Sequence, residues 1–292
     1  MSGVRSHRPL DRVIVTPAQS RDAVLTTIRR ARRELALSIF RCTDEAIIQE
    51  IARAVDRGVQ VDVLVTSRSK GRKKLRRLWT ALENTGAAIH PYTDPVVKYH
   101  AKYLVADNGP ALVASLNFTR KCFRNTIDAL VMTHDPAVVD GLRRLHEADR
   151  EGGPLPRNLP DRLIVGPERA RRQLTALIDG ARSRIRLIDA KLSDPELTRL
   201  LDRRRGEGVA VEVYSAKRLN GMRSHGKLML ADKVAVIGGL AFAALSLDFR
   251  REVALIVREP AAVAALARLF DAVAASESTP TTAPARERRH VC

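Results

Sequence analysis

The sequence predicts an α/β protein of two similar α/β/α halves, each with a mixed β-sheet flanked by helices, related by a pseudo-twofold axis. Three observations predict this fold. The chain repeats itself at an offset of 150 residues, strand-like and helix-like segments alternate within each copy, and a segment rich in glycine and proline separates the copies. A chain of 292 residues is long enough to give each half its own core.

The repeat needs no gap between its matching segments. Residues 13–17 (Val-Ile-Val-Thr-Pro) correspond to 163–167 (Leu-Ile-Val-Gly-Pro), and residues 58–63 (Gly-Val-Gln-Val-Asp-Val) correspond to 208–213 (Gly-Val-Ala-Val-Glu-Val). Two segments in the same register, far apart along the chain, indicate a duplicated unit.

Each copy predicts the same order of elements: a short strand, an amphipathic helix, a strand, a second helix and a second strand. These segments are 13–17, 18–34, 35–40, 44–57 and 59–66 in the first copy, and 163–167, 168–182, 185–190, 194–206 and 209–215 in the second. Asp44 and Asp194 stand at the start of the second helix of each copy. A carboxylate there can accept from free N–H groups and face the positive end of the helix dipole, so both are predicted to be helix caps.

The domain boundaries follow from composition. The first half spans residues 11–148, a Gly- and Pro-containing linker spans 149–161, and the second half spans 162–275. Residues 276–292 are rich in Ser, Thr, Pro and Arg, and we expect this tail to be disordered because it has too few apolar side chains to fold.

Charge and cysteine content narrow the functional classes. The chain has 51 Lys and Arg against 33 Asp and Glu, a net charge of +18 that attracts phosphate-bearing partners, either nucleic acid or anionic lipid. Cys42, Cys122 and Cys292 form no Cys-x-x-Cys pair, so neither a disulfide framework nor a zinc site is predicted. The start of the chain has no apolar signal segment, and Gly238 and Gly239 interrupt the longest apolar run, 234–247. We therefore expect a cytoplasmic protein without a transmembrane segment, for which contact with a membrane would be peripheral.

One chemical motif occurs once in each half. It is a histidine, a lysine two positions later and an aspartate five positions after the lysine: His100, Lys102 and Asp107 in the first half, and His225, Lys227 and Asp232 in the second. In an extended strand, alternate side chains share a face, so each histidine projects together with its lysine. If the halves pack about a pseudo-twofold axis, the two pairs converge on one cleft.

Two imidazoles and two ammonium groups in one cleft fit phosphoryl transfer without a metal or other cofactor. One histidine would attack phosphorus and form a phosphohistidine, the other would protonate the leaving alkoxide, and the roles would reverse when water or an alcohol attacks. Lys102 and Lys227 would hold the non-bridging oxygens. Asp128 follows His100 by 28 residues, and Glu252 follows His225 by 27, each within an apolar strand. We predict that these two carboxylates orient the histidines.

The motif resembles the phospholipase D superfamily signature, HxK(x4)D(x6)GSxN, which two-lobed members carry once in each half. The resemblance covers residues 13–275 and implies an active site between the halves that a monomer completes. It implies that His100 is the nucleophile and His225 the general acid, that Ser115 and Asn117 help to bind phosphate, and that Asp107 and Asp232 are structural. The second half departs from the signature, because residues 239–242 read Gly-Leu-Ala-Phe and lack the serine and asparagine.

The leading prediction is a phospholipase D-type phosphodiesterase that hydrolyses phospholipid head-group esters or transfers them to another alcohol. A metal-independent endonuclease or other nucleic-acid phosphodiesterase is the first alternative, although 4% aromatic residues offer little base stacking. A catalytically weak, basic phosphate-binding protein is the second. The basic stretch 67–79 is read either as a solvated helix face or as a grip on nucleic acid or an anionic membrane.

Overall fold

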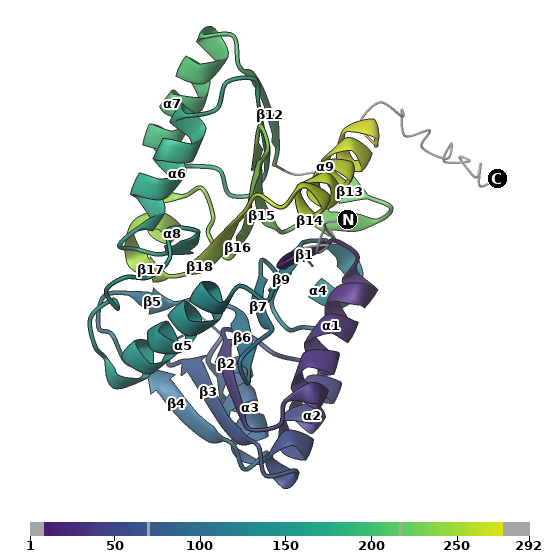
Figure 1. Cartoon of the computed structure of the whole chain (residues 1–292), viewed down its shortest axis with the longest axis vertical. Helices are drawn as coiled ribbons and strands as arrows, with labels where there is room; N and C mark the ends of the chain where they lie inside the picture. Colours follow the sequence, from purple (N-terminus) through teal and green to yellow (C-terminus); the bar gives the residue numbers. More distant parts are fainter. Residues whose placement is uncertain (1–8, 69–70, 216–217, 277–292) are drawn as a thin grey trace, which may run out of the picture.

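The computed structural model describes residues 9–68, 71–215 and 218–276 and consists of two α/β halves (Figure 1). The predicted disordered tail, apart from Ser276, lies outside the described residues. No helix in the described part of the chain is both long enough and apolar enough to cross a bilayer.

The first sheet has seven strands in the order β1-β9-β7-β6-β2-β3-β4. β2 and β3, and β3 and β4, are parallel, whereas the other neighbours are antiparallel, so the sheet is mixed. Its strands are β1 (Asp11–Ile14), β2 (Glu34–Ile39), β3 (Gln60–Thr66), β4 (Ala88–Tyr92), β6 (Tyr103–Ala106), β7 (Ala111–Ala114) and β9 (Leu130–Thr133).

The second sheet has six strands in the order β10-β18-β16-β15-β11-β12, which repeats the first order without a partner for β4. Only β11 and β12 are parallel, at the place of β2 and β3. Its strands are β10 (Leu163–Val165), β11 (Arg184–Ile188), β12 (Ala210–Tyr214), β15 (Lys227–Ala231), β16 (Val234–Gly238) and β18 (Val253–Val257). The same order and the same directions confirm the two α/β halves with mixed sheets that the sequence repeat predicts.

Helices cover the outer faces of the sheets (Figure 1). The helices are α1 (Pro17–Arg30), α2 (Glu45–Asp56), α3 (Arg72–Glu83), α4 (Cys122–Asn125), α5 (Pro136–Glu151), α6 (Ala170–Asp179), α7 (Pro195–Gly206), α8 (Ala244–Phe249) and α9 (Pro260–Ala275). One apolar core packs the first sheet against α1 and α2, and another packs the second sheet against α6 and α7. A third joins strands of both sheets with α5 and α9, so the halves share a buried interface.

The predicted helix caps are confirmed. Asp44 accepts a hydrogen bond from the Ala46 amide at 3.1 Å, and Asp194 accepts one from the Leu197 amide at 2.9 Å. The predicted start of the linker at residue 149 is wrong by three residues. α5 continues through Glu151 and ends at Gly152, where a positive φ of 68° terminates the helix.

Two short parallel ladders connect the halves. β5 (Lys98–Tyr99) of the first half pairs with β17 (Arg250–Arg251) of the second, and β8 (Thr126–Ile127) of the first pairs with β14 (Met222–Ser224) of the second. β14 also pairs with β13 (Arg218–Leu219). Each ladder ends next to a motif histidine, and the ladders therefore position the site.

Candidate active site

The β5–β17 ladder places His100 beside Glu252. In this ladder Lys98 faces Arg250 and Tyr99 faces Arg251, so the next residue on each strand is His100 or Glu252. The His100 amide donates to the Arg251 carbonyl at 2.9 Å, which extends the ladder by one step. His100 Nδ1 then lies 3.0 Å from Glu252 Oε1.

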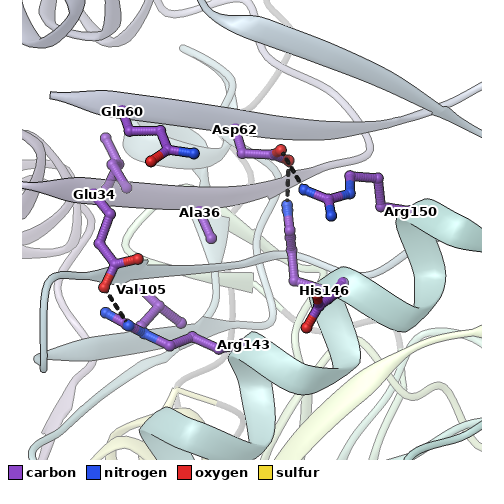
Figure 2. A pocket seen from close by; sticks show the side chains of 10 residues that line it. Glu34, Ala36, Gln60, Asp62, Val105, Arg143, His146 and Arg150 are labelled. Atoms are coloured by element: carbon purple, nitrogen blue, oxygen red, sulfur yellow. Dashed lines mark hydrogen bonds and ion pairs between the residues drawn. The ribbon is translucent and has the colours of Figure 1, made fainter.

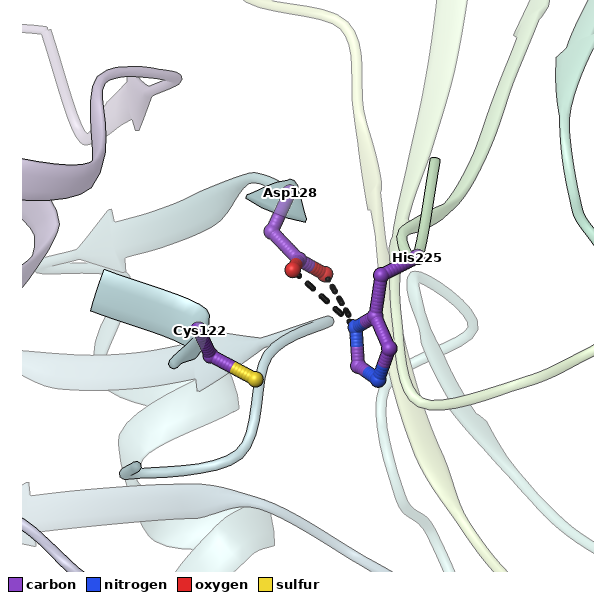
Figure 3. A group of neighbouring side chains, drawn as sticks. All are labelled: Cys122, Asp128 and His225. Atoms are coloured by element: carbon purple, nitrogen blue, oxygen red, sulfur yellow. Dashed lines mark hydrogen bonds and ion pairs between the residues drawn. The ribbon is translucent and has the colours of Figure 1, made fainter. Parts of the chain in front are cut away.

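The β8–β14 ladder does the same for His225 and Asp128. Ser224 faces Ile127, and the Gly226 amide donates to the Ile127 carbonyl at 2.8 Å. A Cβ at position 226 would lie 2.9 Å from that carbonyl oxygen, so the glycine permits the close approach. His225 Nδ1 lies 3.0 and 3.1 Å from the two oxygens of Asp128 (Figure 3).

The histidine–carboxylate pairs are therefore crossed between the halves. Asp128 of the first half contacts the histidine of the second, and Glu252 of the second contacts the histidine of the first. Both carboxylates are predicted from the sequence, but the sequence assigns neither of them to a particular histidine. The crossed assignment follows from the ladders, because each pairs a strand that ends at a histidine with a strand that ends at a carboxylate.

Each motif lysine donates a hydrogen bond to the backbone carbonyl of the histidine two residues before it. Lys102 is 1% exposed, its Nζ lies 2.9 Å from His100 Nδ1, and it also donates to the His100 carbonyl. Lys227 is 7% exposed and donates to the His225 carbonyl at 2.9 Å. Burial and the neighbouring charge of Lys227 lower the pKa of Lys102 although Glu252 opposes the shift. The two nearly buried cations act on each other electrostatically, which favours an anion close to both.

In this site His100 is neutral, whereas the carboxylates of Glu252 and Asp128 are ionised. Burial and the charge of Lys102 lower the pKa of His100 to about 3. Burial alone would raise the pKa of Glu252, but His100, Lys102 and Lys227 outweigh it and lower that pKa. An ionised Glu252 needs a donor, and His100 Nδ1–H supplies it, since the Lys102 ammonium has the His100 carbonyl as its acceptor. The free lone pair is then on Nε2.

Asp128 is ionised for the same reason. Burial raises its pKa, but hydrogen bonding and the charge of His225, together with the charge of Lys227, lower it overall. Lys227 thus acts on Asp128, on Glu252 and on His100. The two pairs consequently belong to one electrostatic site.

Ser115 serves Asp128 directly. It is fully buried, its hydroxyl donates to Asp128 Oδ1 at 2.7 Å, and Thr126 donates to Oδ2 at 2.6 Å. The implied phosphate-binding role of Ser115 stays a prediction. In this structure the Ser115 hydroxyl donates its proton to Asp128 instead. Asn117 is 9% exposed, and its side-chain oxygen has no hydrogen-bond partner among the described residues.

The second half supplies a hydroxyl from a different position. Ser246 on α8 donates to Glu252 Oε1 at 2.9 Å, although glycine stands at 239, whose amide donates to the Val253 carbonyl as the Ser115 amide donates to the Ala129 carbonyl. A Cβ at Gly239 would lie 3.0 Å from Glu252 Oε2, so the longer glutamate occupies the space that a serine would need. Ser246 was not predicted from the sequence. The available signal was its spacing, because Ser246 precedes Glu252 by six residues and Cys122 precedes Asp128 by the same number.

Asp107 and Asp232 stabilise backbone turns rather than line the cleft. Asp107 accepts from the amides of Arg32, Arg33 and Glu34 at 2.8 to 3.2 Å. Asp232 accepts from the amides of residues 182–184 at 2.7 to 2.9 Å. Both residues have positive φ, 45° and 50° respectively. The structural role that the resemblance implies for them stays a prediction, which these backbone contacts favour.

Cys122 lies beside the His225–Asp128 pair (Figure 3). One ligand atom from each of these three residues lies within 4.8 Å of the others, a grouping that could hold a metal ion. The Lys227 ammonium acts on the same carboxylate, however, and a dication beside it would be repelled. The arrangement therefore favours an anionic ligand over a metal ion at this place.

Further side chains at the site were not predicted. The Phe40 ring packs at a tilt of 59° against His100, with ring centroids 4.3 Å apart, and Lys102 Nζ lies over the Phe40 ring, 5.1 Å from its centroid. The Arg41 guanidinium also lies over the Phe40 ring, 5.1 Å from its centroid. Arg250 Nη1 is 3.6 Å from Glu252 Oε1. Phe40 and Arg41 come directly after β2, where strand ends gather, and this position was the available signal.

A polar pocket of about 250 Å³ lies elsewhere, between the first sheet and α5 (Figure 2). Asp62 accepts from His146 at 2.7 Å and from Arg150 at 3.1 Å, and Arg143 pairs with Glu34. These contacts hold the His146 ring against the first sheet. The charges pair with one another, so the pocket has no excess charge to bind a phosphate.

Comparisons with known proteins agree with the fold. Residues 24–150 match the family model described as cardiolipin synthase, PLD-like domain, which includes His100 but ends before His225. A search of curated proteins gives no match. The structure resembles phosphatidylserine synthase from Haemophilus influenzae, with a TM-score of 0.68 and 12% identity, over 90% of this chain and 86% of that one.

The structure also resembles polyphosphate kinase from Porphyromonas gingivalis, with a TM-score of 0.73 and 21% identity. That match covers 89% of this chain but 46% of the kinase, so the chain spans about half of the kinase's length.

Proposed function

We propose that this chain, which belongs to the phospholipase D superfamily of phosphodiesterases and phosphotransferases, cleaves phospholipid head-group phosphodiesters through a phosphohistidine on His100. The observation that carries the proposal is the pair of crossed histidine–carboxylate contacts around two buried lysines. The lipid substrate is supported by the family description and by the likeness to a phosphatidylserine synthase. The structural match to that synthase covers most of both chains.

In the first step, His100 Nε2 attacks phosphorus and the bond to the leaving alkoxide breaks. The low pKa of His100 keeps the attacking lone pair free of a proton, and Glu252 holds the ring by Nδ1. His225, protonated and held by Asp128, gives its proton to the alkoxide oxygen. Lys102 and Lys227 hold the non-bridging oxygens as negative charge accumulates.

In the second step, His225 takes a proton from water or from an acceptor alcohol, whose oxygen attacks the phosphohistidine and releases His100. The choice of roles is supported by exposure. The His100 side chain is 14% exposed, whereas that of His225 is 31% exposed, and the group that exchanges protons with an alcohol benefits from access to solvent.

A nuclease is the second candidate, and α3 favours it. Five cationic side chains on this helix are exposed and form no ion pair within the described chain: Arg72, Lys73, Lys74, Arg76 and Arg77. Several of them share a surface hollow with Arg41, next to the site. Nucleic-acid phosphates would fit this surface. The weak-binder alternative is disfavoured because both histidines keep their carboxylates and lysines.

The test uses purified protein with EDTA on phosphatidylcholine vesicles, phosphatidylglycerol vesicles and plasmid DNA in parallel. We expect lipid turnover, an acid-labile phosphohistidine, and at least ~1,000-fold less turnover in His100→Asn and His225→Asn. His134→Asn, at an exposed histidine outside the site, is the matched control and should keep full activity. DNA nicking without lipid turnover would favour the nuclease, and activity in His100→Asn would refute the mechanism.

A further inference from the structure

Exposed apolar side chains gather at one edge of the active site. Among the described residues, three large hydrophobic side chains are exposed: Val96 at 65%, Leu245 at 47% and Phe249 at 48%. All three belong to the segments that lead into the β5–β17 ladder, which carries His100 and Glu252. We call these three residues the apolar rim.

The ladder register brings the parts of the rim together. Lys98 faces Arg250, so Val96, two residues before Lys98, and Phe249, directly before Arg250, flank the same end of the ladder. Leu245 and Phe249 are four residues apart on α8 and therefore share a helix face. β5, β17 and α8 also lie together at one side of the molecule, next to the junction of the halves (Figure 1).

The fold does not require apolar residues there. The same positions in the first half can be found by counting back from the carboxylates. Leu245 precedes Glu252 by seven residues, as Lys121 precedes Asp128, and Phe249 precedes Glu252 by three, as Asn125 precedes Asp128. Lys121 and Asn125 are exposed as well. The second half thus presents leucine and phenylalanine to water where the first presents polar side chains.

Cations accompany the apolar rim. Lys98 is exposed within β5, Arg250 lies beside Glu252, and the whole chain carries a net charge of +18. Apolar side chains flanked by cations match the surface of an anionic bilayer, where acyl chains lie beneath phosphate groups. A polynucleotide offers the phosphates but little to receive leucine and valine.

We propose that the apolar rim inserts into the surface of an anionic phospholipid bilayer and holds the His100–Glu252 edge of the site against the head-group phosphates. This inference rests on the proposed lipid substrate, and it adds that the substrate is taken from a bilayer rather than from solution. The rim then acts on substrate delivery and not on the chemical step.

The test replaces the rim by the side chains of the first half, in Leu245→Lys/Phe249→Asn. Binding is measured by co-sedimentation with vesicles of phosphatidylglycerol and phosphatidylcholine. Turnover is measured on those vesicles and on a short-chain phosphatidylglycerol below its micelle concentration. We expect at least ~10-fold weaker vesicle binding and vesicle turnover, with unchanged turnover of the soluble lipid. Leu245→Lys adds a positive charge, so loss of binding cannot come from weakened electrostatic attraction.

Two outcomes separate this inference from the proposed function. Unchanged vesicle binding in the double variant would overturn the rim, whatever the enzyme cleaves. Vesicle binding that depends on the rim, with no lipid turnover by the wild type, would retain the rim as a membrane contact and refute the lipid phosphodiesterase. Plasmid binding is the parallel control, and if it weakens in the variant while vesicle binding does not, the apolar rim serves nucleic acid instead.

Discussion

The two halves hold equivalent carboxylates with different side chains. In the first half, Asp128 accepts hydrogen bonds from Ser115 and Thr126. In the second, the longer Glu252 accepts from Ser246, and glycine stands at 239, where a serine would crowd the carboxylate. Each carboxylate still faces the histidine of the other half. The comparison teaches that a departure from a sequence signature need not remove an interaction, because a neighbouring element can supply the same hydrogen bond.

Surface features differ between the halves as well. The first half has the basic helix α3 and strand β4, whereas among the described residues of the second half no strand of the sheet takes the place of β4. The second half exposes Leu245 and Phe249. If the proposed function holds, the halves share the chemistry but meet different parts of the substrate's surroundings.

The crossed pairs give the largest expected effect. Glu252→Gln should slow formation of the phosphohistidine, because His100 loses the carboxylate that holds its Nδ1–H. Asp128→Asn should slow protonation of the leaving group and breakdown of the intermediate, since it acts on His225. Each change should cost ~100- to 10,000-fold in turnover. Rapid-quench measurement of the phosphohistidine separates the two steps. The crossed assignment fails if Glu252→Gln impairs only breakdown.

Copying Ser115 of the first half to its structural equivalent, position 239, should do harm. Gly239→Ser places a side chain 3.0 Å from Glu252 Oε2, which we expect to cost ~1–3 kcal/mol of the free energy of unfolding and most of the activity. The double variant Gly239→Ser/Glu252→Asp recreates the arrangement around Asp128. It should recover part of the lost stability and part of the lost activity. Chemical denaturation and lipid turnover measure the coupling. Additive losses in the double variant would contradict the proposed exchange of space between positions 239 and 252.

Removing the serine hydroxyl that donates to each carboxylate should have a smaller effect. Ser246→Ala should reduce stability by ~1–3 kcal/mol, because Glu252 loses its hydroxyl donor inside the protein. Ser115→Ala should cost less, since Thr126 still donates to Asp128. Thermal unfolding of both variants checks the order. Ser246→Cys, which copies the first-half residue Cys122, is the matched control and should lie between the wild type and Ser246→Ala.

The pH dependence of stability tests the neutral state of His100. The pKa of His100 falls to about 3 in the folded protein, from 6.5 in the unfolded chain. Below pH 6.5 the unfolded chain takes up a proton that the folded protein refuses, so stability should fall as pH drops from 6.5 toward 3. The slope for one such group is at most ~1.4 kcal/mol per pH unit. His100→Asn should flatten the denaturation midpoint against pH in this range. An equal slope in the wild type and the variant would contradict a neutral His100.

Much of the fold could be predicted from the sequence because its signals are local. The repeat, the alternation of strands and helices, and the caps Asp44 and Asp194 depend on residues close together in the chain. The end of α5 was misplaced because Asp149 looks like a linker residue. It is buried and pairs with Arg251 of the other half at 2.9 Å, a contact that no local pattern reveals.

The sequence by itself determined the candidate side chains for the proposed chemistry: His100, Lys102, His225 and Lys227, with Asp128 and Glu252. Only the tertiary structure decided which carboxylate serves which histidine, and that Ser246 supplies the hydroxyl for Glu252. The physical reason is that side-chain spacing fixes what one strand can present, whereas the β5–β17 and β8–β14 ladders form only when two halves far apart in sequence pack together.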